Sequence, residues 1–162
     1  MEQTHEIDLS ALMPLMQEQL HAGKAVQFVA YGKSMLPLLH DSVVTLVSPP
    51  PVLKAGDVPL YRRKSGQYVL HRVVGVNSDG SYRLCGDNQY DIESPILHAQ
   101  VVAVLTTFER DGKVVSVEEP WVKRYVRRLP LRRFWLHYRG MTPKRAFAAL
   151  KRRLRPASSQ KL

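Results

Sequence analysis

Apolar and polar positions alternate with a helical period at the start of the chain. Five apolar residues recur at spacings of three and four: Leu9, Leu12, Met13, Met16 and Leu20. Asp8 or Ser10 can cap such a helix at its start, and Gly23 is suited to its C-terminal end. The pattern therefore predicts a short packing helix within residues 1–24.

From residue 25 to 118 the apolar period shortens to that of strands. Runs rich in Val, Tyr, Phe and Leu are separated by Gly, Pro, Asn and Asp, and the expected strands are residues 25–31, 42–48, 58–63, 67–76, 81–86, 99–109 and 113–118. The turns at 77–80 (NSDG) and 110–112 (RDG) favour tight antiparallel hairpins, and Pro59 indicates an edge strand or a bulge. We expect a mainly β, small, twisted, barrel-like domain over residues 25–118.

Charge divides the chain at about residue 120. Residues 121–162 hold 14 Lys and Arg and no acid, a charge of +14, whereas residues 1–120 hold ten Lys and Arg against 14 acids, a charge of −4. Aromatic residues are interleaved with the cations: Trp121, Tyr125, Phe134, Trp135 and Tyr138. We expect residues 119–162 to form a basic, aromatic, helical tail with a physical role of its own.

The composition of the tail suggests a partner. Cations mixed with aromatic rings are typical of segments at a membrane interface, where each cation gains about 1 kcal/mol from anionic lipid. The sequence thus favours attachment of residues 121–155 to an anionic membrane surface. Nonspecific nucleic-acid binding is the second interpretation, and an acidic protein partner the third.

Other classes of protein are disfavoured. No apolar run approaches the roughly 18–20 residues of a membrane span, and the acidic N-terminus is unlike a secretory signal, so we expect a cytoplasmic protein that the tail can hold at the inner membrane face. The single Cys85 excludes an intrachain disulfide or a CxxC site. The histidine and glycine spacings match no common metal or nucleotide motif, so we expect no metal and no cofactor.

Ser34, within YGKSMLPLLHD, is the residue with the most suggestive setting. A nucleophilic serine needs a base and a third group that orients the base. His71 lies in the predicted strand 67–76, and Asp87 and Asp91 follow in a later turn, where either could orient an imidazole. On the alternative interpretation His71 is a core histidine, and the two aspartates bind their own turn backbone.

Three short motifs then occur in order. The first contains Gly32, Ser34, Met35 and Pro37; the second contains Gly56, Asp57, Tyr61, His71, Arg72 and Val73; the third contains Gly86, Asp87, Asn88 and Asp91. On the basis of these motifs, the chain resembles the type I signal peptidase and LexA-like serine peptidase superfamily. The resemblance covers approximately residues 25–105. The resemblance is strongest to its Ser–His branch, the endoplasmic reticulum and archaeal type.

The resemblance implies a twisted, mostly β fold with Ser34 as nucleophile and His71 as general base. His71 stands where bacterial signal peptidases carry a lysine, and Asp91, or alternatively Asp87, would orient it. The backbone N–H of Ser34 would stabilise the oxyanion, since Gly32 replaces a serine that many bacterial members carry, and Met35 follows the nucleophile.

We therefore expect a serine endopeptidase that cleaves a peptide or leader substrate with a Ser–His dyad or triad. Two alternatives remain open at this point. One is a non-catalytic binding module on the same fold, and the other is a LexA-like self-cleaving regulator whose basic tail binds membrane or nucleic acid.

Overall fold

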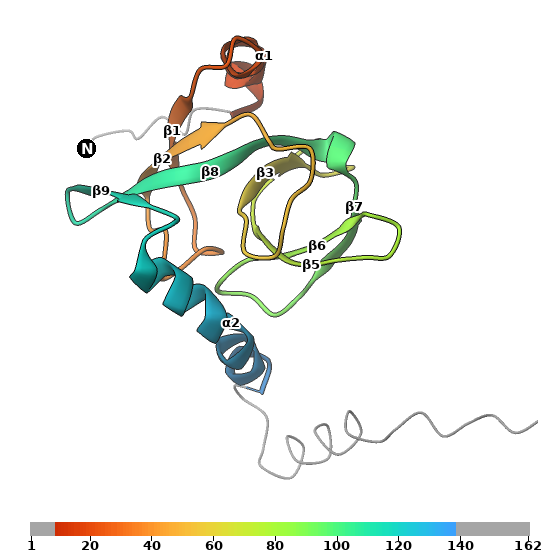
Figure 1. Cartoon of the computed structure of the whole chain (residues 1–162), viewed down its shortest axis with the longest axis vertical. Coiled ribbons are helices and arrows are strands. Elements are labelled where there is room, and N and C mark those ends of the chain that lie inside the picture. The colour runs from red at the N-terminus through yellow and green to blue at the C-terminus, as the bar shows by residue number, and fades with distance from the viewer. Residues whose placement is uncertain (1–8, 139–162) are drawn as a thin grey trace, which may run out of the picture.

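Strands dominate the computed structural model, which describes residues 9–138 of the chain, and a helix lies at each end of them (Figure 1). The helices are α1 (Leu9–His21) and α2 (Pro120–Tyr138), with a short 3-10 turn, η1 (His98–Gln100). The strands are β1 (Val26–Ala30), β2 (Ser42–Val47), β3 (Pro59–Arg62), β4 (Tyr68–Leu70), β5 (Arg72–Val76), β6 (Tyr82–Cys85), β7 (Glu93–Ile96), β8 (Val101–Arg110) and β9 (Lys113–Ser116). The mainly β class and the N-terminal helix are thus confirmed.

The strands form two antiparallel sheets. The larger sheet has the order β1-β2-β8-β3-β4, with β9 paired to β8, and the smaller has the order β5-β6-β7. Strand β8, ten residues long, pairs with β2, β3 and β9 and runs through the centre of the larger sheet. Register shifts in the β2–β8 and β3–β8 pairs accompany the strong curl of the sheets seen in Figure 1.

Three features of the β domain differ from the sequence-based expectation. Residues 67–76 do not form one strand: the chain breaks at His71, and β4 joins the larger sheet while β5 joins the smaller. Of the two expectations for Pro59, the edge strand is wrong, because β3 has neighbours on both sides. A bulge is consistent with the register shift between Leu60 and Tyr61 in the β3–β8 pair, and Pro59 is the first residue of its strand, a position that proline tolerates. Strand β7 was not expected, since Pro95 within it reads as a loop signal.

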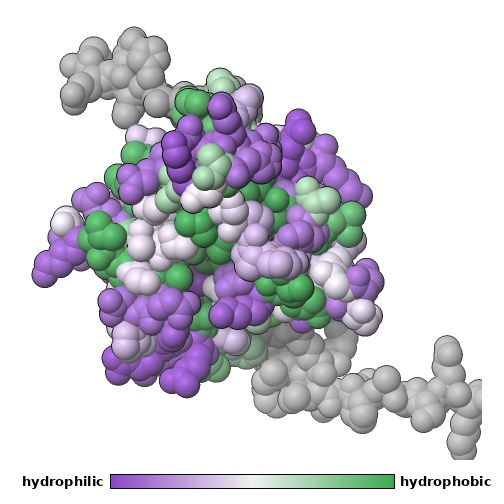
Figure 2. Space-filling view, turned by 45° about the horizontal axis from the view of Figure 1, so that its top comes forward, coloured by the Kyte–Doolittle hydropathy of each residue, from purple (hydrophilic) through white to green (hydrophobic). Residues whose placement is uncertain are grey.

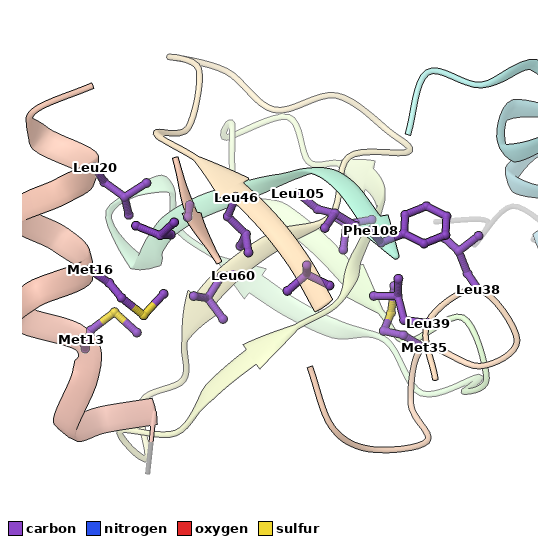
Figure 3. Packing of buried hydrophobic residues seen from close by; sticks show 14 of the residues in the cluster. Met13, Met16, Leu20, Met35, Leu38, Leu39, Leu46, Leu60, Leu105 and Phe108 are labelled. Atoms are coloured by element: carbon purple, nitrogen blue, oxygen red, sulfur yellow. The ribbon is translucent and has the colours of Figure 1, made fainter. Parts of the chain in front are cut away.

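Two apolar clusters fill the β domain. In the first, α1 points Met13, Met16 and Leu20 at the larger sheet, as the helical spacing predicted (Figure 3). At the far end of this cluster Met35, Leu38 and Leu39 pack near Phe108: the loop that carries Ser34 is therefore anchored in the core (Figure 3). The second cluster lies around Tyr61, Val73, Tyr82 and Leu84.

Helix α2 packs on the β domain along one stripe. Val122 and Leu129, seven residues apart, are both buried, and Tyr125 and Val126 are partly buried beside the first core. Residues 139–162 of the predicted tail, including 139–155 of the proposed membrane segment, lie outside the described residues. Neither described helix is long and apolar enough to cross a membrane. On the face drawn in Figure 2, hydrophobic and hydrophilic residues are interspersed.

Candidate active site

The Ser34 loop is shaped by the residues on either side of the serine. Gly32 has a φ of 113°, which side chains with a Cβ rarely adopt, so glycine lets the chain turn into the loop. Beyond Ser34, the N–H groups of Leu38 and Leu39 both donate to the Met35 carbonyl at 3.1 Å, and Met35 is buried. Ser34 is half-buried between the turn at Gly32 and the anchored segment that begins at Met35.

The turn at residues 86–88 holds the backbone of this loop. The N–H of Asn88 donates to the Ser34 carbonyl at 2.8 Å, and the Asn88 side-chain amide donates to the Lys33 carbonyl at 3.2 Å. A Cβ at position 86 would lie 2.6 Å from the Ser34 carbonyl oxygen, so only glycine permits this approach. The first and third sequence motifs therefore meet in the folded chain.

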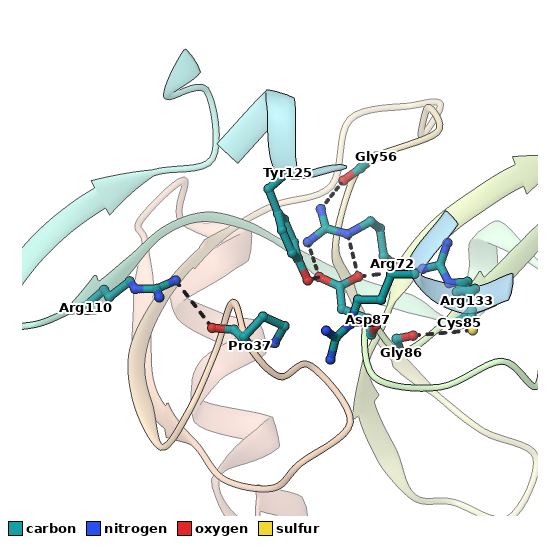
Figure 4. A network of polar contacts seen from close by, with 10 residues as sticks. Pro37, Gly56, Arg72, Cys85, Gly86, Asp87, Arg110, Tyr125 and Arg133 are labelled. Carbon is teal, nitrogen blue, oxygen red and sulfur yellow. Dashed lines mark hydrogen bonds and ion pairs between the residues drawn. The ribbon is translucent and has the colours of Figure 1, made fainter. Parts of the chain in front are cut away.

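Asp87 is the centre of a buried ion-pair network (Figure 4). Arg72 donates from Nε to Oδ1 at 2.8 Å and from Nη2 to Oδ2 at 2.6 Å, and both side chains are almost fully buried. From α2, the Tyr125 hydroxyl donates to Oδ2 at 3.2 Å, and Arg133 Nη2 lies 3.6 Å from Oδ1. Asp87 thus joins β5 and α2 to the turn that holds Ser34.

His71 has a different carboxylate beside it. Its Nδ1 lies 3.2 Å from Oε1 of Glu93, on β7, and 3.4 Å from the Tyr61 hydroxyl. Within residues 9–138 no hydrogen bond joins His71 to Asp87, which is bound by Arg72, or to Asp91, whose side chain is exposed. The structure thus places a third carboxylate, that of Glu93, where either aspartate was expected.

Glu93 was overlooked because its strand was overlooked. The residue is separated from His71 by 22 positions and reaches it only through the pairing of β7 with β6, in which Leu84 lies opposite Glu93. The signal in the sequence is an acid at the start of the short segment ESPI, five residues after Asn88 of the GDN turn.

The pKa values of both His71 and Glu93 are lowered, each by a different cause. Burial lowers the pKa of His71 below its ordinary value, and the Glu93 carboxylate opposes this only in part. Hydrogen bonds from Arg63, whose Nε lies 2.8 Å from Oε2, lower the pKa of Glu93. At neutral pH the imidazole is therefore neutral and the carboxylate is charged.

The proton of the neutral imidazole is assigned to Nδ1, because an ionised carboxylate can only accept a hydrogen bond. That leaves Nε2 of His71 as an acceptor. Nε2 has no hydrogen-bond partner within the described chain. If it were also fully buried, it would be a buried nitrogen without a partner, but among the described residues only Arg133 has such atoms. Nε2 therefore keeps the small solvent contact of a residue that is 2% exposed.

Ser34 and His71 are linked through other residues and not by a direct bond. No hydrogen bond joins the Ser34 hydroxyl to His71 within residues 9–138; the connection runs from Ser34 to Asn88, Asp87 and Arg72. A cleft of about 820 Å³ lies elsewhere, between α2 and residues 54–58, and is lined by neither Ser34 nor His71.

No protein-family model matches the chain, and no curated protein or solved structure matches it significantly.

Proposed function

We propose that the chain is a serine endopeptidase of the signal-peptidase and LexA-like type, with Ser34 as nucleophile and His71 as general base. One observation carries the proposal: three motifs that are distant in the sequence meet at one place. The Gly86–Asn88 turn binds the backbone of Ser34, and its Asp87 binds Arg72, the neighbour of His71. Glu93 adds the orienting carboxylate that a base requires.

The chemistry would run as follows. Ser34 Oγ attacks the carbonyl carbon of the scissile peptide bond while its proton passes to Nε2 of His71. The imidazolium then gives this proton to the departing amine, and a water, deprotonated by His71, hydrolyses the Ser34 ester. Glu93 holds the Nδ1 proton and stabilises the imidazolium, and the Ser34 N–H faces the oxyanion. The Ser34–His71 hydrogen bond would form in the substrate complex, because catalytic contacts are often long in the free enzyme and tighten only when substrate binds.

A non-catalytic binding module is the rival function, and one observation favours it: the Ser34 hydroxyl makes no hydrogen bond to His71 in the described chain. This rival predicts that the Ser34 hydroxyl is no more reactive than that of an exposed serine. A self-cleaving regulator would instead cleave its own chain, which mass spectrometry of the incubated protein detects.

The test is the rate of labelling by a fluorophosphonate probe between pH 5 and 9, with the modified serine located by mass spectrometry. Ser65, exposed in the turn before Gly66, serves as the internal reference, and Ser65→Ala is the matched control variant. We expect Ser34 to be labelled at least 10²-fold faster than Ser65, the low end of what a positioned general base contributes. The rate should rise with pH around a midpoint below 6.5, because burial lowers the pKa of His71.

His71→Gln keeps a polar side chain of similar size and should reduce Ser34 labelling to the Ser65 level, with thermal melting as the check on folding. Equal labelling of Ser34 and Ser65, or labelling of Ser34 that is unchanged in a folded His71→Gln variant, would reject the proposal in favour of the binding module.

A further inference from the structure

Helix α2 has two chemically distinct faces. Its inner face packs on the β domain through Val122 and Leu129 and sends Tyr125 and Arg132 to the Asp87–Asn88 turn. Its outer face carries four exposed cations: Lys123, Arg124, Arg127 and Arg128. No acidic residue occurs between Pro120 and Tyr138, so nothing on the helix itself offsets these charges.

Two large apolar side chains continue the same outer face. Leu131 is 67% exposed and Trp135 is 72% exposed, and they are four residues apart, one turn of helix. Leu131 in turn follows Arg127 and Arg128 at four- and three-residue spacing. The outer face, defined as the four cations with Leu131 and Trp135, thus runs from a cationic half to an apolar half.

The cationic half borders the cleft of about 820 Å³. Val58, Leu105, Val117 and Val126 contribute apolar lining. Lys123, Arg124 and Arg127 line the cleft from the helix, and Lys54 and Arg72 line it from the β domain. Two acids also line the cleft, but each has a partner there: Glu118 pairs with Lys123 at 2.7 Å, and Asp57 accepts from the Lys54 N–H at 2.8 Å. Positive charge is therefore in excess over an apolar recess.

We propose that the outer face of α2 binds an anionic phospholipid surface. The lipid phosphates would lie against the cations, and Leu131 and Trp135 would enter the interface, where a Trp ring is favoured. Residues 25–118 carry nine Lys and Arg against nine acids, so the β domain has no net charge that attracts it to the lipid. The cations of α2 would therefore orient the molecule with that helix toward the surface. Nucleic acid would use the cations but gives no role to an exposed leucine, and lipid is for that reason the occupant we argue for.

The test is co-sedimentation of the full chain with vesicles of phosphatidylglycerol and phosphatidylcholine, compared with phosphatidylcholine alone, at low salt. The triple variant Arg124→Gln/Arg127→Gln/Arg128→Gln removes three charges from the outer face. The matched control, Lys24→Gln/Lys64→Gln/Lys113→Gln, removes three exposed charges from the β side. Residues 139–162 hold eight further Lys and Arg, which both variants retain, so the difference between them reports on α2.

We expect the α2 triple variant to bind phosphatidylglycerol vesicles about 100-fold more weakly than the control, roughly fivefold for each cation. The second variant, Leu131→Ser/Trp135→Ser, should weaken binding at a salt concentration where the charge contribution is screened. Tryptophan emission should shift to the blue on vesicle binding in Trp121→Phe, which leaves Trp135 as the sole tryptophan.

Three results would overturn the proposal. The first is no binding of the full chain to phosphatidylglycerol vesicles, and the second is equal binding of the two triple variants. The third is full vesicle binding by Leu131→Ser/Trp135→Ser together with binding to duplex DNA that is tighter than binding to vesicles. This third result would assign the face to nucleic acid. None of the outer-face residues contacts Ser34 or His71, so these results leave the labelling test of the proposed function unaffected.

Discussion

The most direct test of the network in Figure 4 is the replacement of Asp87 by Asn. Asn has nearly the same shape but no charge, so the change isolates the ionic contribution from packing. Asp87 is fully buried, and Arg72 spans both of its oxygens with almost no exposure of its own. In the variant the charged Arg72 guanidinium would stay buried without a carboxylate partner, and it would keep its hydrogen bond to the Gly56 carbonyl.

The magnitude follows from that geometry. Removing one partner of a buried ion pair leaves an uncompensated charge and costs about 3–5 kcal/mol of unfolding free energy. Arg133 adds to the cost, because its Nε and Nη2 have no hydrogen bond and Asp87 supplies the nearby negative charge. For a chain of this size about 1 kcal/mol corresponds to roughly 2–4 °C, so the melting temperature should fall by roughly 6–20 °C.

Urea unfolding followed by circular dichroism measures the loss, with Asp91→Asn as the control. Asp91 is exposed, and its replacement should change the unfolding free energy by less than about 0.5 kcal/mol. The double variant Asp87→Asn/Arg72→Met removes the orphaned charge and should recover part of the lost stability. A cost below about 1 kcal/mol for Asp87→Asn would refute the view that this ion pair holds the turn under Ser34.

Three further predictions concern the candidate site. Glu93→Gln removes the charge that raises the pKa of His71, so the pH profile of Ser34 labelling should move to lower pH and its plateau rate should fall by about 10²-fold. An unchanged profile would exclude Glu93 as the orienting acid. Arg132→Gln removes two hydrogen bonds to the turn that holds Ser34, which should cost about 1–3 kcal/mol and slow labelling several-fold; stability loss without slower labelling would make Arg132 purely structural. Burial lowers the pKa of His71 below 6.5 in the folded chain, so acid protonates the unfolded chain first and stability should fall as the pH drops from 7 through 6.5. Urea midpoints should show a smaller fall in His71→Gln.

Elements defined by local signals could be predicted from the sequence. Helix α1 follows its apolar period and ends as expected, where Gly23 adopts a φ of 73° and its N–H bonds to the Leu20 carbonyl. The hairpin between β8 and β9 follows from Asp111 and Gly112, both of which have positive φ. In each case a few neighbouring residues determine the conformation, so no knowledge of distant contacts is needed.

The junction at His71 could not be predicted in this way. Residues 67–76 form one uninterrupted strand-like run, and the period of a run does not tell which sheet each half will join. The carboxylate at His71 depends on the same long-range pairing, because Glu93 arrives on a strand of the smaller sheet. Sequence order favoured Asp87 and Asp91, but Arg72 occupies the first and solvent surrounds the second.

Helix α2 carries part of the basic charge of residues 121–162 and packs it against the β domain. Its cations differ in role by their position on the helix. Arg132 donates to the backbone carbonyl of Asp87 and to the Asn88 side chain, and Arg133 lies beside the buried Asp87 carboxylate. Arg124 and Arg128, in contrast, face solvent. A helix is stiff along its length, so displacing α2 would at once withdraw the inner contacts from Asp87 and the turn that binds Ser34. The cations of α2 therefore have two roles. Those on the outer face favour a lipid surface, and those on the inner face hold the turn that binds Ser34, the candidate nucleophile.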